Sequence, residues 1–322
     1  MGDLPPYREL VVGAGTDGLR LDQWLALRFA DRSRSWIARA IRQGLVRTGD
    51  ERPLDCAHRV RDGLVLRVYA PGIAPAGPPP PFPPILHEDR HLVAVDKPAG
   101  LLAHPSGSNF VWALISLAKR RYPEDRVDLV HRLDRDTSGV LLITRDLETN
   151  RHLKVAVRDG RAHKEYEAIV RGSVPWDHHL LRGPIGPADG PIRVQMAVRP
   201  DGLPACTEVQ VLERREALTR VRCILHTGRT HQIRVHLAHA GFPLLGDRLY
   251  GVPPEVFLRA REHGVDDVVV AAAGAPRHAL HARRVVVPLP DGGSLTLTAP
   301  LAADLRRWWD HPERLPHDRD PD

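Results

Sequence analysis

The stretch VHRLDRDTSG, residues 130–139, holds two carboxylates, Asp134 and Asp136, among arginines. A strand-like apolar run, VLLIT, follows at 140–144, so a tight polar loop leads into a buried strand. Opposite charges on either side of Asp134 keep its carboxylate ionised near neutral pH. An ionised, partly desolvated carboxylate is suited to nucleophilic attack or to proton abstraction. The alternative is a salt-bridged surface turn without a chemical role.

A second segment, HTGRTHQIRVHLAHAG at 226–241, predicts a helix over about residues 230–240. Thr230 is placed to cap this helix, and Gly241 is placed to end it. The first turns then present three basic side chains: Arg229, His231 and Arg234. Because a helix N-terminus in a basic setting attracts anions, we expect this segment to face phosphate or carboxylate groups.

Metal chemistry is disfavoured by the same two segments. Several of the 18 histidines lie there, but no carboxylate stands at HExxH-type spacing, and neighbouring arginines would repel a divalent ion. The three cysteines lie far apart in the sequence, without the paired spacing of a zinc site or a disulfide framework. We therefore expect no metal and no cofactor, and a histidine-dependent metal hydrolase is the weaker rival.

The elements that must position these residues fall on either side of a proline-rich stretch. PGIAPAGPPPPFPP, residues 71–84, contains eight prolines, which block helices and sheet ladders and favour an extended chain. We interpret it as an interdomain linker. After it, strand-like runs begin near residues 92, 140, 164, 207, 218 and 283, whereas helical patterns occur near 148–158, 230–240 and 301–309. This pattern predicts an α+β domain with a mixed, mainly antiparallel sheet.

A smaller unit precedes the linker, at about residues 17–70. Apolar residues at helical spacing predict one helix from Leu21 and a second from near Ser33, with Gly44 just past its end. Six arginines lie between Arg28 and Arg47 against a single acid. This density favours nucleic-acid binding, with an ordinary charged surface as the alternative. The arginines expected to contact the nucleic acid are Arg32, Arg34, Arg39 and Arg42.

Overall composition agrees with a polyanionic partner without proving one. The formal net charge is +6, and nearly all of the cationic charge is arginine, which suits phosphates and base edges. GC-rich coding would give a similar arginine content to any protein. The start, MGDLPPYREL, lacks the basic and apolar pattern of a signal peptide, and the apolar runs are too short to span a bilayer. We expect a cytoplasmic protein with no membrane contact.

Six motifs occur in an order and spacing that resemble a known family. They are DKPAGLLAHP (96–105), HRLDRDTSG (131–139), KEYEAIVRG (164–172), HTGRTHQIRVH (226–236), GDRLYG (246–251) and ALHARR (279–284). Together they resemble the RluA-type RNA pseudouridine synthases. The segments LRLDQWL and SRSWIARAIRQGLV resemble the alpha-L RNA-binding domain, named for small-subunit ribosomal protein S-four. The resemblance covers about residues 17–310.

The resemblance implies a reaction and roles for individual residues. The family isomerises specific uridines in RNA, detaching uracil from ribose at nitrogen 1 and rejoining it through carbon 5. Asp134 corresponds to the essential carboxylate, which either attacks the anomeric carbon or removes the ribose 2′ proton. Tyr166 corresponds to the tyrosine that stacks on uracil and is a candidate to move the carbon 5 proton. Arg234 corresponds to the arginine paired with Asp134, and Asp136 is expected to be a turn residue.

RNA contacts complete the expected site. Arg132 corresponds to the residue that fills the gap left by a flipped nucleotide. The other expected contacts are Lys97, His104, Arg135, Arg229 and His231. Large-subunit ribosomal RNA is the favoured substrate, with transfer RNA as the alternative. The alternative function is a non-catalytic RNA-binding or ribosome-assembly protein with the same fold. We expect the protein to be a monomer.

The predicted organisation therefore has five parts. They are an N-terminal extension (1–16), the alpha-L domain (17–70), the linker (71–84), a catalytic domain of the pseudouridine synthase type (85–310) and a tail expected to be disordered (311–322).

Overall fold

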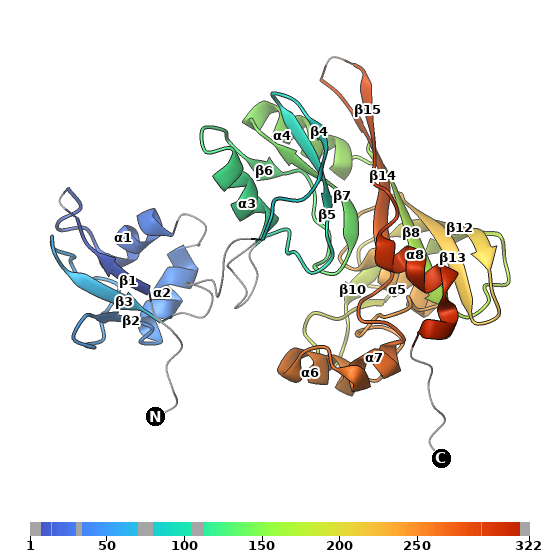
Figure 1. Cartoon of the computed structure of the whole chain (residues 1–322). Coiled ribbons are helices and arrows are strands. Elements are labelled where there is room, and N and C mark those ends of the chain that lie inside the picture. Colours follow the sequence, from blue (N-terminus) through green and yellow to red (C-terminus); the bar gives the residue numbers. More distant parts are fainter. Residues whose placement is uncertain are drawn as a thin grey trace. The chain divides into compact units, whose positions relative to one another are not determined.

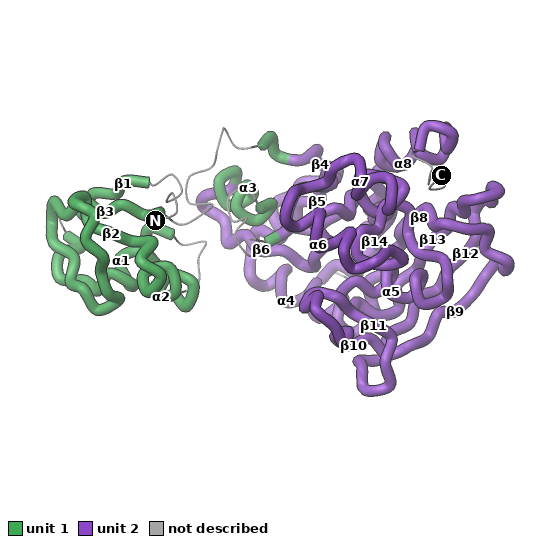
Figure 2. Tube along the Cα trace, turned by 90° about the horizontal axis from the view of Figure 1, so that it is seen from below, with its two compact units in different colours: residues 1–82, 104–121 green, residues 83–103, 122–322 purple. Residues whose placement is uncertain are grey.

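A computed structural model describes residues 8–13, 15–29, 34–69, 80–104, 113–290 and 292–315. The chain divides into two compact units, Met1–Phe82 with His104–Arg121 and Pro83–Ala103 with Tyr122–Asp322 (Figure 2). The main boundary falls inside the predicted linker, but the first unit also takes residues 104–121, which the sequence placed in the second domain. Most of the linker, residues 71–79, lies outside the described residues, as does Arg32.

The first unit packs two helices with a three-stranded antiparallel sheet of order β1-β3-β2 (Figure 1). Its elements are β1 (Arg8–Val11), α1 (Leu21–Arg28), α2 (Arg34–Arg42), β2 (Val46–Thr48), β3 (Val65–Val68) and α3 (Leu114–Arg121). The predicted apolar face of α1 is buried, with Leu21, Trp24 and Leu25 in a core that also holds Ile37 and Ile41 of α2. Helices α1 and α2 therefore form as their apolar spacing predicts.

The second unit is built on a ten-stranded sheet whose main path is β4-β5-β7-β14-β8-β13-β12-β9, with β15 on β14 and β6 on β7. The strands are β4 (Ile85–Glu88), β5 (Leu92–Lys97), β6 (Asp128–Leu129), β7 (Ser138–Thr144), β8 (His163–Arg171), β9 (His178–Arg182), β12 (Cys206–Arg214), β13 (Leu218–Leu225), β14 (Leu280–Pro288) and β15 (Ser294–Thr298). Strands β7 and β14 pair in parallel, and the other pairs are antiparallel. The predicted mixed, mainly antiparallel α+β fold is confirmed.

Helices and a small hairpin surround this sheet (Figure 1). They are α4 (Leu147–Arg158), β10 (Ile185–Pro187), β11 (Met196–Val198), α5 (Gln232–His239), α6 (Pro254–His263), α7 (Asp267–Ala273), α8 (Ala303–Asp310) and a 3-10 helix (Pro312–Arg314). Helix α4 packs near β7 and β14, whereas α5 packs near β9, β11 and β12. Within the described residues no helix is both long and apolar enough to cross a membrane. Residues 311–315 of the tail expected to be disordered are ordered, because Leu315 packs against the cluster that holds Trp308 and Trp309, and residues 316–322 lie outside the described residues.

Strand β7, which follows the Asp134 loop, lies in the middle of the sheet, and every one of its residues is buried. This explains why the run VLLIT is continuously apolar. Gly139 pairs with Ala282 where β7 meets β14, at a φ of 108°. A side chain at this position would collide with the backbone of Ala282. The glycine that ends the HRLDRDTSG motif therefore lets the two central strands approach each other.

Candidate active site

The loop that carries Asp134 joins β6 to β7 and is held from one side by a buried lysine. The ammonium of Lys97, at the end of β5, donates to the carbonyl oxygens of Leu101 at 2.8 Å, Pro98 at 2.9 Å and Arg135 at 3.0 Å. Burial lowers the pKa of Lys97 to about 7, while three carbonyl acceptors match the three donors of a protonated ammonium. Since Arg135 follows Asp134 directly, Lys97 fixes the backbone beside the carboxylate.

This geometry does not agree with the prediction that Lys97 contacts RNA. The residue is 0% exposed, and its ammonium is fully occupied by backbone carbonyls. The sequence analysis placed Lys97 correctly beside the site, but the predicted RNA contact is wrong. Lys97 is a residue that shapes the loop.

Two histidines hold the other end of the Asp134 loop: His278 lies just before β14, and His281 lies within it. Thr137 Oγ1 hydrogen-bonds His278 Nε2 at 2.8 Å, and Ser138 Oγ hydrogen-bonds His281 Nδ1 at 2.9 Å. Burial lowers the pKa of each histidine to about 4, so both rings are neutral at physiological pH. Thr137 and Ser138 thus each have a neutral histidine partner, and Arg277 Nη2 also donates to Ser138 Oγ at 3.3 Å.

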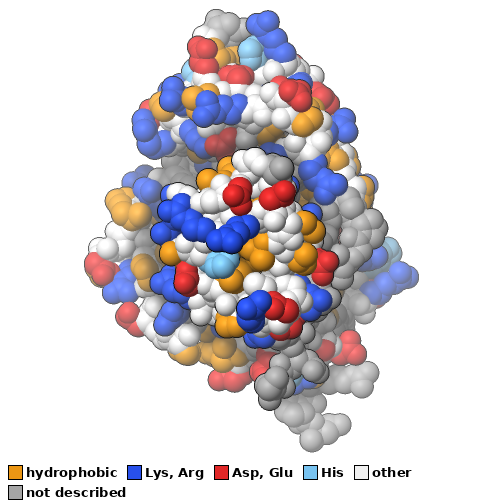
Figure 3. All heavy atoms as spheres, turned by 90° about the vertical axis from the view of Figure 1, so that its left-hand side faces the viewer, with side chains coloured by type: hydrophobic (Ala, Val, Ile, Leu, Met, Phe, Trp, Pro, Cys, Tyr) orange, Lys and Arg blue, Asp and Glu red, His pale blue; other side chains and the backbone are white. Residues whose placement is uncertain are grey.

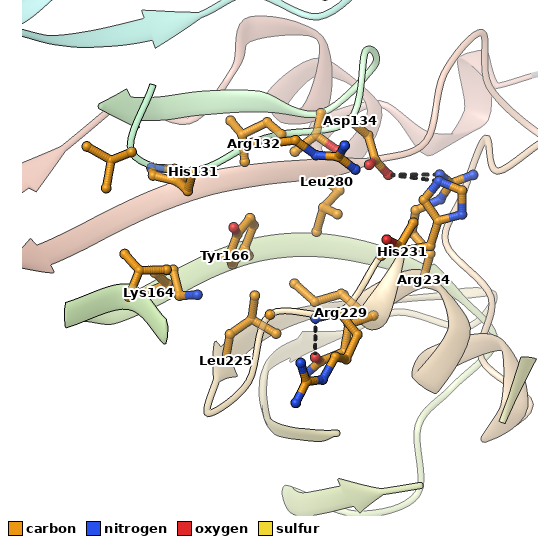
Figure 4. A pocket seen from close by; sticks show the side chains of 18 residues that line it. His131, Arg132, Asp134, Lys164, Tyr166, Leu225, Arg229, His231, Arg234 and Leu280 are labelled. Atoms are coloured by element: carbon orange, nitrogen blue, oxygen red, sulfur yellow. Dashed lines mark hydrogen bonds and ion pairs between the residues drawn. The ribbon is translucent and has the colours of Figure 1, made fainter. Parts of the chain in front are cut away.

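Asp134 is joined to a second carboxylate through one guanidinium (Figure 4). Arg234, in α5, donates from Nη1 to Asp134 Oδ2 at 2.9 Å. The same side chain donates from Nε and Nη2 to the two oxygens of Asp247, at 2.7 and 2.9 Å. Asp247 therefore binds Arg234 in a bidentate ion pair, which orients the Nη1 group of Arg234 toward Asp134. The predicted pairing of Asp134 with Arg234 is present in the structure.

The charges keep both carboxylates ionised. Burial alone would raise the pKa of Asp134, but Arg234 and nearby histidines outweigh it and hold that pKa below its ordinary value. Burial would likewise raise the pKa of Asp247, but the charge of Arg234 outweighs it and lowers that pKa to about 2. The two carboxylates in turn raise the pKa of Arg234. Asp134 is thus an anion partly exposed to the pocket, as nucleophilic or basic chemistry requires.

His231 approaches the same oxygen of Asp134 as Arg234 does, with Nε2 at 3.8 Å from Oδ2. Its Nδ1 lies 2.9 Å from the hydroxyl of Tyr250, which itself accepts a hydrogen bond from the backbone N–H of Met196 at 3.0 Å. An ionised carboxylate can only accept hydrogen bonds, so the tautomer that suits both neighbours carries its proton on Nε2, toward Asp134, and accepts at Nδ1 from the Tyr250 hydroxyl. Burial, with Arg234, lowers the pKa of His231 to about 4, so a neutral N–H faces Asp134.

The backbone at His231 is unusual and corrects one prediction. Helix α5 begins at Gln232, and His231 takes the N-cap position in the left-handed region, at a φ of 57°. Thr230 was predicted to cap this helix, and that is wrong. Instead the side chain of Gln232 turns back and accepts hydrogen bonds from Thr227 Oγ1 at 2.8 Å and from the N–H of Arg229 at 2.9 Å. Strained backbone of this kind concentrates at functional sites.

A pocket of about 290 Å³ opens beside Asp134. Its walls come from the Asp134 loop, from β8 and from the start of α5, so Asp134, Tyr166 and Arg234 all line it (Figure 4). Tyr166 projects from β8, and burial raises the pKa of its hydroxyl, so the phenol is neutral. An apolar ring near an ionised carboxylate is suited to holding a flat base. The three residues predicted to be catalytic are thus brought together.

The expected RNA contacts divide into three groups. Arg132 and Arg229 line the pocket and are exposed, as contacts at its mouth would be. His231 lines it from within. Arg135 is exposed but does not line the pocket, and His104 is grouped with the first unit.

The first unit presents its own basic surface. Arg34, Arg39 and Arg42 are exposed along α2, and Arg34 also pairs with Asp22 at 3.6 Å. Figure 3, which views the molecule from the side at the left of Figure 1, shows Lys and Arg side chains in several groups, with Asp and Glu side chains between them. Exposed arginines on one helix are suited to the non-specific attraction of phosphates, and the predicted RNA contact of this helix stays a prediction.

Sequence reasoning missed several residues of the site. Asp247 and Tyr250 lie in the motif GDRLYG, which was noticed for its resemblance but given no role. Lys164 and His131 also line the pocket, and both belong to recognised motifs. Asp136, expected to be a turn residue, pairs with Arg248. The motifs indicated that these residues belong to the site, whereas the partners of each side chain depend on the fold.

An ionised carboxylate fixed beside a tyrosine, with arginines at the pocket mouth, fits an enzyme that acts on a nucleic-acid base. In the described ranges no group of three or more His, Cys, Asp or Glu residues is placed to hold a metal ion. Residues 91–239 match the family model described as RNA pseudouridylate synthase.

Curated relatives agree over nearly the whole chain. The ribosomal large subunit pseudouridine synthase D of Xanthomonas campestris is 36% identical over 93% of this chain and 91% of its own length. The protein of that name from Nitrosomonas europaea is 36% identical over 96% of this chain and 89% of its own length. Among solved structures, human RNA Pseudouridylate Synthase Domain Containing 4 is 27% identical with a TM-score of 0.55, covering 72% of this chain and 93% of that one. The chain belongs to the RluA-type RNA pseudouridine synthases.

Proposed function

We propose that this enzyme isomerises specific uridines of large-subunit ribosomal RNA to pseudouridine. The family membership gives the reaction, and the printed names of the relatives from Xanthomonas campestris and Nitrosomonas europaea favour the substrate. The observation that carries the mechanism is the Asp134–Arg234–Asp247 chain, which presents one ionised carboxylate to a pocket that a flipped uridine would enter.

In this proposal Asp134 acts on the ribose while Tyr166 holds the base. Arg234 and His231 both approach the Oδ2 oxygen of Asp134, at 2.9 and 3.8 Å. The other oxygen, Oδ1, makes no hydrogen bond within the part of the chain that the structure describes. We assign Oδ1 as the reacting oxygen, because donors on Oδ2 hold the carboxylate still and leave Oδ1 nucleophilic.

The exposed arginines would bind and open the RNA. Flipping a base out of its stack costs a few kcal/mol, and the planar guanidinium of Arg132 at the pocket mouth would recover part of it by stacking. The arginines of α2 would add phosphate contacts that carry no sequence information. If the protein neutralises about four phosphates of single-stranded RNA, log affinity should fall with log salt at a slope near −3.

A pseudouridine map of ribosomal and transfer RNA tests this proposal. Cells without the gene should lose pseudouridine at one or a few large-subunit positions, and wild-type protein, but not Asp134→Asn, should restore them. Loss confined to transfer RNA would replace the proposed substrate. Unchanged maps, together with no product from purified protein on unmodified RNA, would contradict the proposal itself.

A further inference from the structure

The C-terminal helix α8 is joined to the catalytic loop through an arginine that the reaction outlined above does not use. Arg277 lies just before β14, and only 8% of the residue is exposed. Its Nε and Nη2 donate to the two oxygens of Asp304, in the first turn of α8, at 2.7 and 2.8 Å. Burial would raise the pKa of Asp304, but the hydrogen bonds and the charge of Arg277 outweigh it and lower that pKa. The two residues therefore form an ionised, bidentate pair.

The remaining nitrogen of Arg277 points at the turn that carries Asp134. Nη1 donates to the carbonyl oxygen of Asp136 at 2.9 Å, and Nη2 also donates to Ser138 Oγ at 3.3 Å. The turn is closed by the backbone N–H of Thr137, which donates to the carbonyl oxygen of Asp134 at 3.2 Å. Asp136 lies inside this four-residue turn, so a shift of its carbonyl group also moves Asp134.

The same arrangement of donors is found at Arg234. That side chain donates from Nε and Nη2 to Asp247, and from Nη1 to Asp134 itself. Arg277 uses the same three atoms, with Nε and Nη2 on Asp304 and Nη1 on the turn. In each case a carboxylate outside the pocket lining orients an arginine, and the third nitrogen of that arginine holds the catalytic turn.

Helix α8 gives Asp304 a fixed position, because its apolar side is buried. Trp308 and Trp309 pack in one cluster with Ile169 of β8 (Figure 1). The guanidinium of Arg277 also lies over the Trp308 ring, 5.6 Å from its centre. Helix α8 thus connects the central sheet to the Asp134 turn through a well-packed side chain.

We propose that Arg277 and Asp304 are positioning residues for the catalytic carboxylate, so that helix α8 is a functional part of the active site. The inference rests on the proposed role of Asp134. Neither residue lines the pocket, and both act by holding the turn where Asp134 reaches the ribose. Placement of this kind matters, because a displacement of about 1 Å typically costs about 100-fold in rate.

Asp304→Asn tests the inference with little disturbance. An asparagine oxygen can still accept from Arg277 Nη2 and from the backbone N–H of Leu305, but the amide places a donor against Arg277 Nε. With folded enzyme in excess over RNA, the saturating single-turnover rate should fall about tenfold, the effect of one charge-assisted hydrogen bond. The RNA concentration that gives half of this rate should stay unchanged. Because this rate does not depend on the fraction of enzyme that is unfolded, reduced stability alone would leave it at the wild-type value.

Asp125→Asn is the matched control. Asp125 pairs with Arg145, whose Nη1 donates to the carbonyl oxygen of Asp89 at 3.0 Å, so this pair also joins an arginine to the backbone. The side chains of Asp125 and Asp304 are 26% and 30% exposed. Arg145 directly follows β7, at the end of the strand opposite to the Asp134 turn. The control should lower the urea midpoint to a similar extent and leave the saturating rate unchanged. An equal loss of rate in both variants would mean that any lost ion pair slows the enzyme, which overturns the inference.

A double-mutant cycle determines whether Asp304 acts through Arg277. Arg277→Lys keeps the charge but lacks the planar fork that joins Asp304 to the turn, so it should lower the saturating rate more than Asp304→Asn does. In the Arg277→Lys protein, adding Asp304→Asn should change the rate little, because the arginine that Asp304 orients is gone. An equal rate factor for Asp304→Asn in both backgrounds would mean that the two residues act independently, and the inference would be wrong. If Arg277→Lys does not fold, the rate of Asp304→Asn against that of Asp125→Asn still decides.

The failures of the two proposals are distinguishable. If wild-type protein forms no pseudouridine, the proposed function fails. If wild type is active and Asp304→Asn is equally fast, or loses only RNA affinity, the inference about α8 fails while the proposed function stands.

Discussion

Replacing Asp247 by asparagine should damage both the stability and the rate of this enzyme. The Asp247 side chain is 0% exposed. Its Oδ1 accepts from Arg234 Nη2 and from the backbone N–H of Leu249, both at 2.9 Å, and an asparagine oxygen can keep these bonds. Its Oδ2 accepts from Arg234 Nε at 2.7 Å, where the asparagine amide would place a donor against a donor. The change therefore removes the charge and one specific bond.

The size of the effect follows from the burial of the pair. Removing one partner of a buried ion pair costs about 3–5 kcal/mol of folding free energy, because the other charge is left uncompensated. Arg234 keeps its bond to Asp134 but loses the bidentate grip that fixes its direction. A shift of about 1 Å in a positioning group typically costs about 100-fold in rate. We expect a loss of that order in the single-turnover rate.

The stability difference should also depend on pH. The folded-state pKa of Asp247 is lowered to about 2, against about 3.9 in an unfolded chain. The ionised group thus stabilises the fold above about pH 4, and this contribution is lost as the pH falls toward 2. A shift of this size corresponds to roughly 2–3 kcal/mol. The difference in the free energy of unfolding between wild type and Asp247→Asn should therefore decrease by about that amount between pH 5 and pH 2.

Urea denaturation at several pH values and single-turnover isomerisation would measure these effects. Asp201→Asn is the control, since that exposed carboxylate pairs with Arg199 at the surface and should leave the stability almost unchanged. If Asp247→Asn were as stable as wild type and equally fast, Asp247 would have no part in holding Arg234, and the reasoning would be refuted.

Four other changes have definite expected outcomes. Asp134→Asn should abolish isomerisation while the protein stays folded and its RNA affinity stays unchanged, because an amide is neither a comparable nucleophile nor a base; measurable turnover would remove Asp134 from the mechanism. His231→Leu should slow single turnover about tenfold, whereas His231→Gln, which keeps an N–H donor at the same strained position, should retain most of the rate. Gly139→Ala should lower the urea midpoint strongly, since φ is 108° and the Ala282 backbone blocks a side chain; a wild-type midpoint would contradict the packing described. Changing Arg34, Arg39 and Arg42 together to glutamine should weaken RNA binding and reduce the salt slope by about 2 without changing the single-turnover rate at saturating RNA.

Local patterns predicted the elements that bury a clear apolar face. Helix α4 is amphipathic and begins at the cap Asp146, and its bounds, Leu147–Arg158, match the helix expected over 148–158. Strand β7 is apolar throughout because both of its faces are covered. Helix α6, by contrast, was not predicted, and it has no buried residue whose spacing could have revealed it. Periodicity therefore identifies an element only where tertiary packing uses one face.

The site was predictable only in part, because its pairs join distant segments. Asp134 and Arg234 are 100 residues apart, so their pairing was available from the family resemblance alone. The occupation of Lys97 by three carbonyl groups depends on how two loops meet, and its charge suggested RNA instead. Thr230 looked like a helix cap because nothing local reveals that His231 adopts a left-handed backbone. Residue types in the sequence indicated the chemistry of the site, whereas the role of each side chain depends on tertiary contacts that the sequence does not show.

The most direct test uses purified protein on unmodified large-subunit ribosomal RNA, with pseudouridine mapped at every position. We predict that wild type converts one or a few uridines and that Asp134→Asn, at equal RNA occupancy, converts none. Conversion by Asp134→Asn at the wild-type rate, or no conversion by wild type on any part of this RNA, would contradict the account.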